Sequence, residues 1–282
     1  MQRPTYLAGS WYPDTAQACQ AAIERHARDA RPEQASWRGA LLPHAGWRYC
    51  VDVAAQTLRW LAEGTPDAPC VVVFGSHRGP HGPNTVFRGD AWETPLGPIP
   101  CARVHADALA ARLGLEDEPI RPRHPDNGVE VLLPLVRYFF PRASLLMLGV
   151  AASDVALGIG RAVGAALGAA GERAVYVAST DLTHYGPRYD FTPRGEGAEA
   201  VRWVRDVNDE GFIAACARGA ADEALLHGVE CHSACCPGAA AAALCALESA
   251  GAAPRGTLVR HTLSYDVSPD DNYVGYAGLV FA

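Results

Sequence analysis

The sequence predicts an α/β fold, in which helices cover both faces of a sheet. Apolar runs typical of buried strands alternate along the chain with segments of helical periodicity. No long linker, internal repeat or low-complexity tract divides the 282 residues, and 49% of them are apolar. A chain of this length and composition buries a substantial core. We therefore expect one large domain or two small ones.

Each expected element follows from a local pattern. Short apolar runs that end in turn residues predict buried strands at 39–43, 71–74, 144–150 and 174–180. Helical periodicity predicts helices at 51–64, 104–114, 129–140 (despite Pro134) and 154–171, and helices dominate 197–250. Shorter strand-like pieces lie within 84–100, and two strand-like runs close the chain at 256–265 and 272–282.

Charge and composition exclude some classes of function. The net charge is −7, which makes non-specific binding to nucleic acid a poor hypothesis. We expect no membrane span, because the chain has no run of eighteen apolar residues, and no signal peptide, because the first residues lack an apolar core. The nine cysteines are odd in number and scattered, which favours reduced thiols. The sequence therefore predicts a cytoplasmic protein.

Polar side chains follow the predicted strands where each strand ends. His44 and His77 come directly after two strands, and Asp181 and His184 follow a third. Cys235 stands at the start of an alanine-rich helix, where unpaired backbone N–H groups favour a thiolate. In an open α/β sheet such strand ends meet in one crevice, where ligands bind. The alternative is that these residues have only structural roles, with the histidines hydrogen-bonded within loops and the cysteine buried as a small apolar residue.

The residue types suggest a metal bound by imidazole and thiolate. Two histidines and one anion leave coordination positions open, which suits iron(II), and a cysteine also suits copper(I) or zinc. A second arrangement is a zinc site built from neighbouring residues, namely Cys231, His232, Cys235 and Cys236. That arrangement lacks the second Cys/His pair of a zinc ribbon or finger. A third is a metal-free hydrolase in which Cys235 is the nucleophile and His184 or His44 the base.

Five ordered motifs resemble those of the Memo family, whose bacterial members are often labelled AmmeMemoRadiSam system protein B. The motifs are AGSWYP at 8–13, PHAGW at 43–47, GSHRGP at 75–80, STDLTHYG at 179–186 and ACC before PGAAAAAL at 234–244. The resemblance runs to YVGYAGLVF at 273–281 and implies a single domain, 1–282, with a central mixed sheet flanked by helices. That fold is similar to the class III extradiol catechol dioxygenases. By motif, the resemblance implies His44, His77 and Cys235 as metal ligands and Asp181 and His184 as an accessory pair.

The chain departs from the resembled motifs at several positions. Arg78 replaces the second histidine of S-H-H, and Asn127 replaces the histidine of E-H-S-x-E, while Glu130 keeps its second glutamate. Cys236 stands where the cysteine motif has glycine. Arg78 would offer a fixed cation to an anionic substrate, or else form a surface salt bridge. Glu130 either faces the pocket or caps a helix, and His124 is a possible replacement for the missing imidazole.

These observations lead to one principal expectation and one rival. The principal one is an oxidoreductase, similar to a dioxygenase, that uses iron(II), or else copper, with zinc the weakest choice. His184, supported by Asp181, would act as acid and base on a small or peptide substrate held by Arg78 and Glu130. The rival is a non-catalytic module that handles metal or binds a peptide, because a fold does not dictate an activity. The sequence gives no oligomeric state.

Overall fold

Four parallel strands form the centre of the fold. The structure is a computed structural model, and it describes residues 2–28, 36–120 and 122–282. The strands lie side by side in the order β2 (Gly39–Leu42), β9 (Ala174–Ser179), β3 (Cys70–Gly75) and β8 (Ser144–Gly149). They confirm the four strands predicted from apolar runs, with ends that differ by at most one residue.

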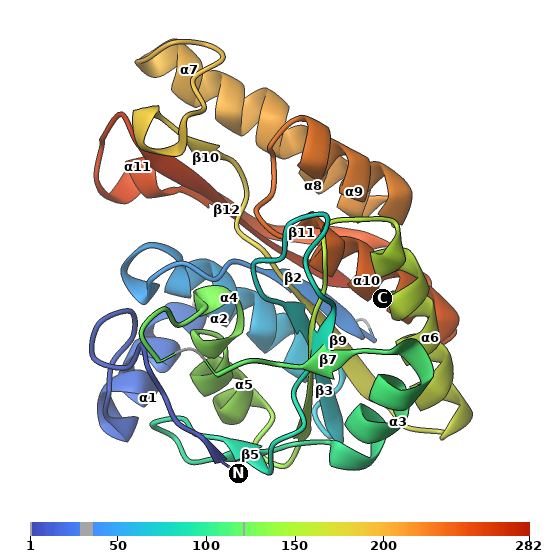
Figure 1. The fold of residues 1–282 in the computed structure, drawn as a ribbon. Helices are drawn as coiled ribbons and strands as arrows, with labels where there is room; N and C mark the ends of the chain where they lie inside the picture. Colours follow the sequence, from blue (N-terminus) through green and yellow to red (C-terminus); the bar gives the residue numbers. More distant parts are fainter. Residues whose placement is uncertain (1, 29–35, 121) are drawn as a thin grey trace.

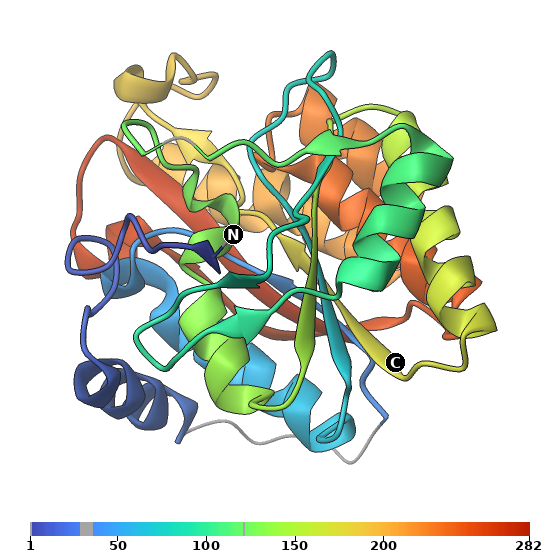
Figure 2. The same cartoon turned by 60° about the horizontal axis from the view of Figure 1, so that its bottom comes forward.

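Antiparallel strands extend the sheet at both edges and make it mixed. On one side β12 (Tyr273–Phe281) runs antiparallel to β2, and both β10 (His184–Tyr185) and β11 (Gly256–Leu263) pair with β12. On the other side β4 (Thr85–Val86) is antiparallel to β8, and β7 (Glu116–Asp117) follows β4. A separate small sheet consists of β1 (Gln2–Arg3), β5 (Ala91–Trp92) and β6 (Ile99–Pro100). In Figure 2 the small sheet lies in front of the central strands, near the N-terminus.

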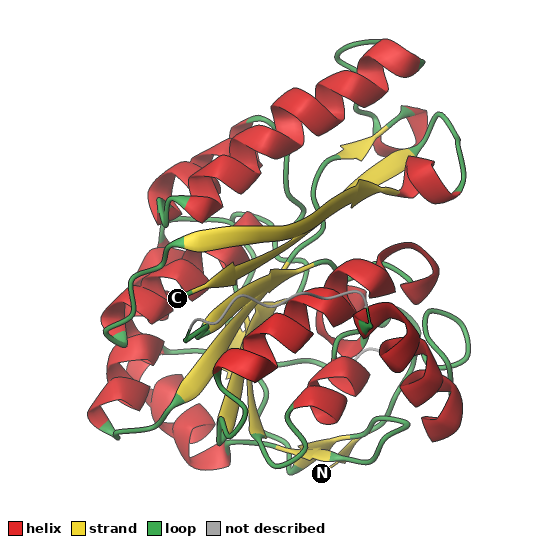
Figure 3. Ribbon diagram, turned by 180° about the vertical axis from the view of Figure 1, so that it is seen from behind, coloured by secondary structure: helices red, strands yellow, loops and turns green. Residues whose placement is uncertain are grey.

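Helices cover both faces of the central sheet, as the alternating pattern predicts (Figures 1 and 3). One core contains α1 (Ala16–Ala27), α2 (Trp47–Gly64) and α5 (Leu133–Phe139), and the other contains α3 (Arg103–Leu113), α6 (Val155–Ala169) and α10 (Pro237–Ser249). Val71 and Val73 of β3 pack into the first core, whereas Val72 and Phe74 pack into the second. Successive side chains of a strand point to opposite faces of the sheet, and here both faces are buried. The strand is therefore apolar throughout.

Helices α6 and α10 pack in unusually close contact. A Cβ atom at Gly160 would lie 2.2 Å from the carbonyl oxygen of Ala242, and one at Gly164 would lie 2.1 Å from that of Ala246. Only glycine allows this approach, because any side chain would meet the backbone of α10. The contact fixes α10 against the sheet, and with it the residues that directly precede the helix.

The helix predicted at 129–140 is wrong as a single element. The structure has α4 (Asn127–Glu130), a break, and then α5, in which Pro134 occupies the first turn. A proline lacks the N–H that a helix interior requires, whereas the first turn leaves that group unpaired. The apolar pattern continued across the break because both helices face the same core.

The helical character of 197–250 is confirmed in detail. The segment contains α7 (Ala198–Trp203), a π-helical turn at Val204–Asp209, α8 (Glu210–Ala217), α9 (Ala221–Glu230) and α10. Two short elements complete the described chain, a 3-10 turn at Pro187–Tyr189 and α11 (Ser264–Val267). None of the helices in the described ranges is both long enough and apolar enough to cross a membrane.

Candidate metal centre

Three neighbouring strands bring the predicted site residues to one edge of the sheet. His44 follows β2, His77 follows β3, and Asp181 follows β9, which lies between them. Ser76 has a φ of 65°, a left-handed conformation that turns the chain sharply between β3 and His77. Cys235 reaches the same edge from the loop before α10. The convergence expected from strand ends is therefore present.

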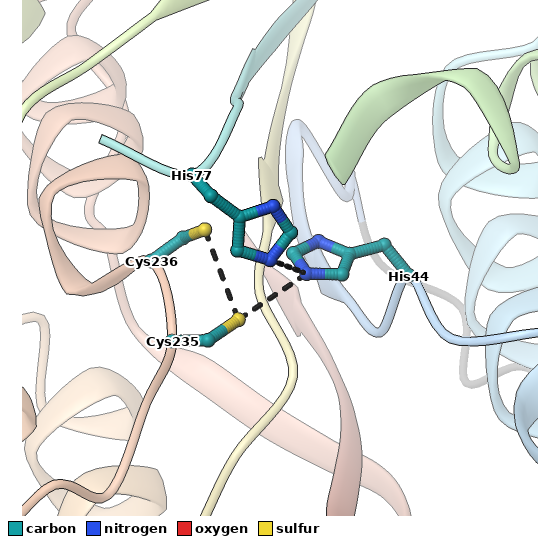
Figure 4. Close-up of side chains that lie close together, drawn as sticks. All are labelled: His44, His77, Cys235 and Cys236. Atoms are coloured by element: carbon teal, nitrogen blue, oxygen red, sulfur yellow. Dashed lines mark hydrogen bonds between the residues drawn. The ribbon is translucent and has the colours of Figure 1, made fainter. Parts of the chain in front are cut away.

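The side chains form a compact cluster, shown in Figure 4. The Nε2 atoms of His44 and His77 lie 3.1 Å apart, and the Sγ atom of Cys235 lies 3.2 Å from His44 Nε2. Cys236 adds a second sulfur 3.7 Å from the first. The four ligand atoms all lie within 4.8 Å of one another, an arrangement that could hold a metal ion. Cys231 and His232, which the alternative zinc site requires, are not part of this cluster.

Hydrogen bonds at the outer ring nitrogens orient both imidazoles. His44 Nδ1 lies 2.9 Å from Ser179 Oγ, and that hydroxyl donates its proton to the Gly128 carbonyl, so it accepts from His44. His77 Nδ1 lies 3.0 Å from a carboxylate oxygen of Asp126. Each ring therefore carries a proton on Nδ1 outside the cluster, and Nε2 is the atom that faces the interior of the cluster. Ligands of metal ions are commonly held in this way.

The cluster also contains a thiol and an imidazole whose pKa values are shifted in opposite directions. Burial alone would raise the pKa of Cys235, but its hydrogen bond with Cys236 and the nearby His44 and His77 hold that pKa well below the usual value. Burial opposes protonation of His77, yet hydrogen bonds to Asp126 and Cys235 raise its pKa to about 11. A thiolate therefore faces an imidazolium when a proton is the only cation in the cluster. A metal ion would take the place of that proton.

Asp181 connects the histidine side of the cluster to the cysteine side. Its carboxylate accepts the backbone N–H of His44 at 2.6 Å, and its backbone carbonyl accepts the N–H of Cys235 at 3.1 Å. Its own N–H lies 3.3 Å from Cys235 Sγ. Because Asp181 is fully enclosed, burial raises its pKa, and the nearby charge of His44 opposes the rise. Asp181 thus fixes the distance between two candidate ligands.

His184 lies beside the cluster on β10. Its Nδ1 atom lies 3.0 Å from the carbonyl oxygen of Leu182, and its ring packs edge-on against Tyr189. The carbonyl can only accept, so His184 carries its proton on Nδ1 and leaves Nε2 for other partners. The acid–base role of His184 and Asp181 stays a prediction.

Comparison with known proteins identifies the family of the chain. The model of the Memo-like protein family matches residues 3–280. The chain belongs to the Memo family. A MEMO1 family protein of Methanopyrus kandleri is 30% identical over 297 residues, which cover 100% of this chain and 99% of that protein. Similar relatives occur in Thermococcus onnurineus (28% identical, 100% of this chain and 99% of the relative) and Methanococcoides burtonii (29% identical, 99% of both).

In this Memo family member, Arg78 is buried rather than exposed. Its Nη2 atom lies 2.8 Å from Glu118, and the two side chains are 7% and 3% exposed. The salt bridge considered for Arg78 therefore exists, but in the interior. Arg78 also lines a cavity of about 270 Å³ beside His77, together with His124 and Asn127. His124 is thus placed beside the site, while Asn127 donates its side-chain amide to the His44 carbonyl.

Glu130 holds the N-terminal segment in place. One carboxylate oxygen accepts the backbone N–H groups of Tyr6 and Leu7, both at 2.7 Å, and the hydroxyl of Tyr12 at 2.9 Å. Glu130 is 1% exposed and does not line the cavity beside His77. Its assignment to substrate binding stays a prediction, whereas its role as an anchor is visible.

Sequence reasoning missed Asp126 and Ser179, which orient the two histidines. Asp126 precedes Asn127 in the altered motif, and its carboxylate also caps α4 through the N–H of Gly128. An acidic residue before a glycine is a recognisable helix-start signal, but it does not reveal a histidine 49 positions away. Ser179 ends β9 as an ordinary buried strand residue, and nothing in the sequence distinguishes it.

Proposed function

We propose that this Memo family protein is a metal-dependent oxidoreductase, with iron(II) or copper held by His44, His77 and Cys235. One observation carries the proposal. The two imidazole Nε2 atoms and the thiolate sulfur converge with separations of 3.1 and 3.2 Å, while Ser179 and Asp126 hold the Nδ1 side of each ring. Atoms that can each donate a lone pair come this close when a cation lies between them, and a metal ion would replace the proton that otherwise supplies that charge.

The donor set fits a redox-active ion. Imidazole suits iron and copper, thiolate suits copper(I) and zinc, and three ligands leave room for a further group. When bound, such an ion would supply one-electron redox chemistry at this edge of the sheet. Asp126 and Ser179 would keep the imidazole rings aimed at it, as the partners of metal-ligating histidines do elsewhere.

His184 is the group to which we assign proton transfer. Its Nδ1 proton is held by the Leu182 carbonyl, so a substrate would exchange protons with Nε2. Asp181 contributes negative charge nearby, because the charge of His184 acts on its pKa. General acid–base catalysis of this kind accelerates reactions by about 10²–10⁴-fold.

The cavity beside His77 suggests a small or peptide substrate that carries an anionic group. Arg3 and Arg78 both line it, and the Nε atom of each has no hydrogen-bond partner in the described part of the chain. Glu118 neutralises Arg78, and Asp126, which also lines the cavity, is paired with His77. The guanidinium of Arg3 stacks on Trp92 and, within the described part of the chain, donates to the backbone carbonyl of Pro119. Arg3 is therefore the cation left to bind a carboxylate or a similar anion.

A metal-content measurement tests the proposal. Protein purified without oxygen should contain about one equivalent of iron or copper, and both His44→Ala and Cys235→Ala should lose it. His184→Ala should keep the metal and lose turnover with oxygen and candidate anionic substrates. Wild-type protein that holds no metal and cannot be loaded would rule out the oxidoreductase.

The second thiol of the cluster favours one rival function, a non-catalytic module that handles metal or binds a peptide. Cys236 lies close enough to occupy a coordination position that a substrate would need. Oxygen consumption by the loaded protein separates the two functions. For either function we propose a cytoplasmic location, which suits the nine free cysteines.

A further inference from the structure

Cys236 is a buried thiol for which the proposed three-ligand site has no use. It is 3% exposed and directly precedes α10, and its backbone N–H donates to Thr180 Oγ1 at 3.0 Å. Its Sγ atom lies 3.7 Å from that of Cys235 and 3.5 Å from the carbonyl oxygen of Ser76. The close packing of α6 and α10 holds the start of the helix, so the position of this thiol is built into the fold.

Three of the six separations among the four ligand atoms can be compared with those of a tetrahedral site, and all six are at most 4.8 Å. Bond lengths of about 2.3 Å to sulfur and about 2.0 Å to nitrogen place tetrahedral ligands about 3.8 Å apart for two sulfurs, about 3.3 Å for two nitrogens and about 3.5 Å for a mixed pair. The observed values are 3.7 Å between the sulfurs, 3.1 Å between the Nε2 atoms, and 3.2 Å between Cys235 Sγ and His44 Nε2. Each lies within about 0.3 Å of the tetrahedral value.

We propose that Cys236 is a fourth metal ligand, which closes the site into a Cys₂His₂ centre for a soft, tetrahedral cation such as zinc or copper(I). This inference rests on the proposed function only in requiring that the cluster binds metal. Two thiolates and two imidazoles are a donor set that favours zinc and copper(I) over iron(II). The fourth ligand would fill the position that a three-ligand centre leaves open.

The Ser76 carbonyl oxygen is a hydrogen-bond acceptor that competes with the proposed metal ion for the Cys236 side chain. When the Cys236 thiolate takes up a proton from solvent, its bond to the metal breaks and the resulting thiol can donate to this oxygen, which lies 3.5 Å away. The site then has three ligands and an open position. Cys236 would therefore control whether the proposed oxidoreductase site is accessible. Because both partners lie within 4 Å of the same sulfur, the exchange needs only a side-chain rotation.

Absorption spectra of the cobalt(II)-loaded protein measure how many thiolates bind the metal. Tetrahedral cobalt gives visible d–d bands, and each bound thiolate adds near-ultraviolet charge-transfer absorption. We expect wild-type protein to show two thiolates, Cys236→Ser to show about half of the charge-transfer intensity, and Cys231→Ser, the matched control, to equal wild type. In competition with a chelator, Cys236→Ser should bind zinc on the order of a hundredfold more weakly, because the binding free energy is spread over four ligands.

The outcomes separate this inference from the proposed function. Wild-type intensity in Cys236→Ser, with the signal lost in Cys235→Ala, overturns the fourth ligand and leaves the three-ligand site intact. No cobalt or zinc bound by wild type overturns both. X-ray absorption on the zinc-loaded wild type needs no variant: two sulfurs in the first shell support the inference, and a single sulfur overturns it.

Discussion

Two clusters that contain histidine lie on either side of the segment 181–183, and their polar contacts differ in kind. In the structural cluster, defined by Asp209, Thr183 and His261, every acceptor faces a donor. One oxygen of Asp209 accepts the N–H and the hydroxyl of Thr183 at 3.1 and 2.5 Å, and the other accepts His261 Nε2 at 2.9 Å. In the metal cluster, defined by His44, His77, Cys235 and Cys236, four atoms that can each bind a metal ion lie within 4.8 Å of one another.

This difference distinguishes polar groups that stabilise the fold from polar groups that are arranged to bind a ligand. Asp209 is fully buried, and a buried carboxylate is tolerated when its oxygens are satisfied. The metal cluster brings its candidate ligand atoms to a common point, where a metal ion would replace the proton that His77 shares with Cys235. We therefore expect changes in the structural cluster to alter unfolding, and changes in the metal cluster to alter metal binding.

The largest effect should follow the loss of Cys235. A saturating metal ion should stabilise the wild type by about 4 kcal/mol when its concentration is 1,000 times the dissociation constant, because it binds the native state alone. In Cys235→Ala most of this gain should be lost, while Cys231→Ser should retain it. Thermal unfolding with and without zinc measures both, and an equal gain in Cys235→Ala would place the metal elsewhere.

Asp209→Ala should give the next largest effect, but on unfolding. Removing the carboxylate leaves His261 and Thr183 without their acceptor, and each buried group left unsatisfied costs about 1–3 kcal/mol. Chemical denaturation measures the change in the free energy of unfolding. Metal stoichiometry should stay at the wild-type value under native conditions, and a selective loss of metal without destabilisation would contradict the comparison.

The fold was largely predictable from the sequence because its central strands are buried on both faces. Val71 to Phe74 form an unbroken apolar run, and such runs identify parallel strands directly. The helix expected at 129–140 failed because one apolar stripe spans two helices, and the position of Pro134 in a first turn depends on tertiary packing. A local pattern cannot distinguish a kink from a break.

The candidate ligands were predictable, but the groups that support them were not. His44, His77 and Cys235 each lie beside a strand end or a helix start, which the sequence displays. The partners of these and of other buried groups come from distant parts of the chain: Glu118 lies 40 positions from Arg78, and Glu130 lies more than 100 positions from Tyr6. Hydrogen bonds formed across a tertiary fold leave no periodic trace in a single sequence.

Asp126→Asn should produce an intermediate effect that is confined to the metal cluster. The carboxylate accepts from His77 Nδ1 at 3.0 Å, and loss of such a partner typically weakens metal binding by about 10–100-fold. Competition with a chromophoric chelator measures the dissociation constant. The matched control is Asp117→Asn, an exposed acid on β7, which should leave the constant unchanged. An unchanged constant in Asp126→Asn would show that His77 needs no second partner.

The smallest effects should come from two asparagines that hold equivalent positions in the two clusters. Asn127 donates to the carbonyl of His44 at 2.9 Å, and Asn208 donates to the hydroxyl of Thr183 at 2.9 Å. A single hydrogen bond of this kind contributes about 0.5–1.5 kcal/mol.

Asn127→Ala should therefore weaken metal binding about two- to tenfold with little change in unfolding, because it loosens one ligand loop. Asn208→Ala should lower the free energy of unfolding by a similar amount and leave the metal dissociation constant unchanged. Chelator competition and denaturation on both variants give four values, and a crossed pattern, in which Asn208→Ala alone weakens metal binding, would mean that the clusters act as one unit.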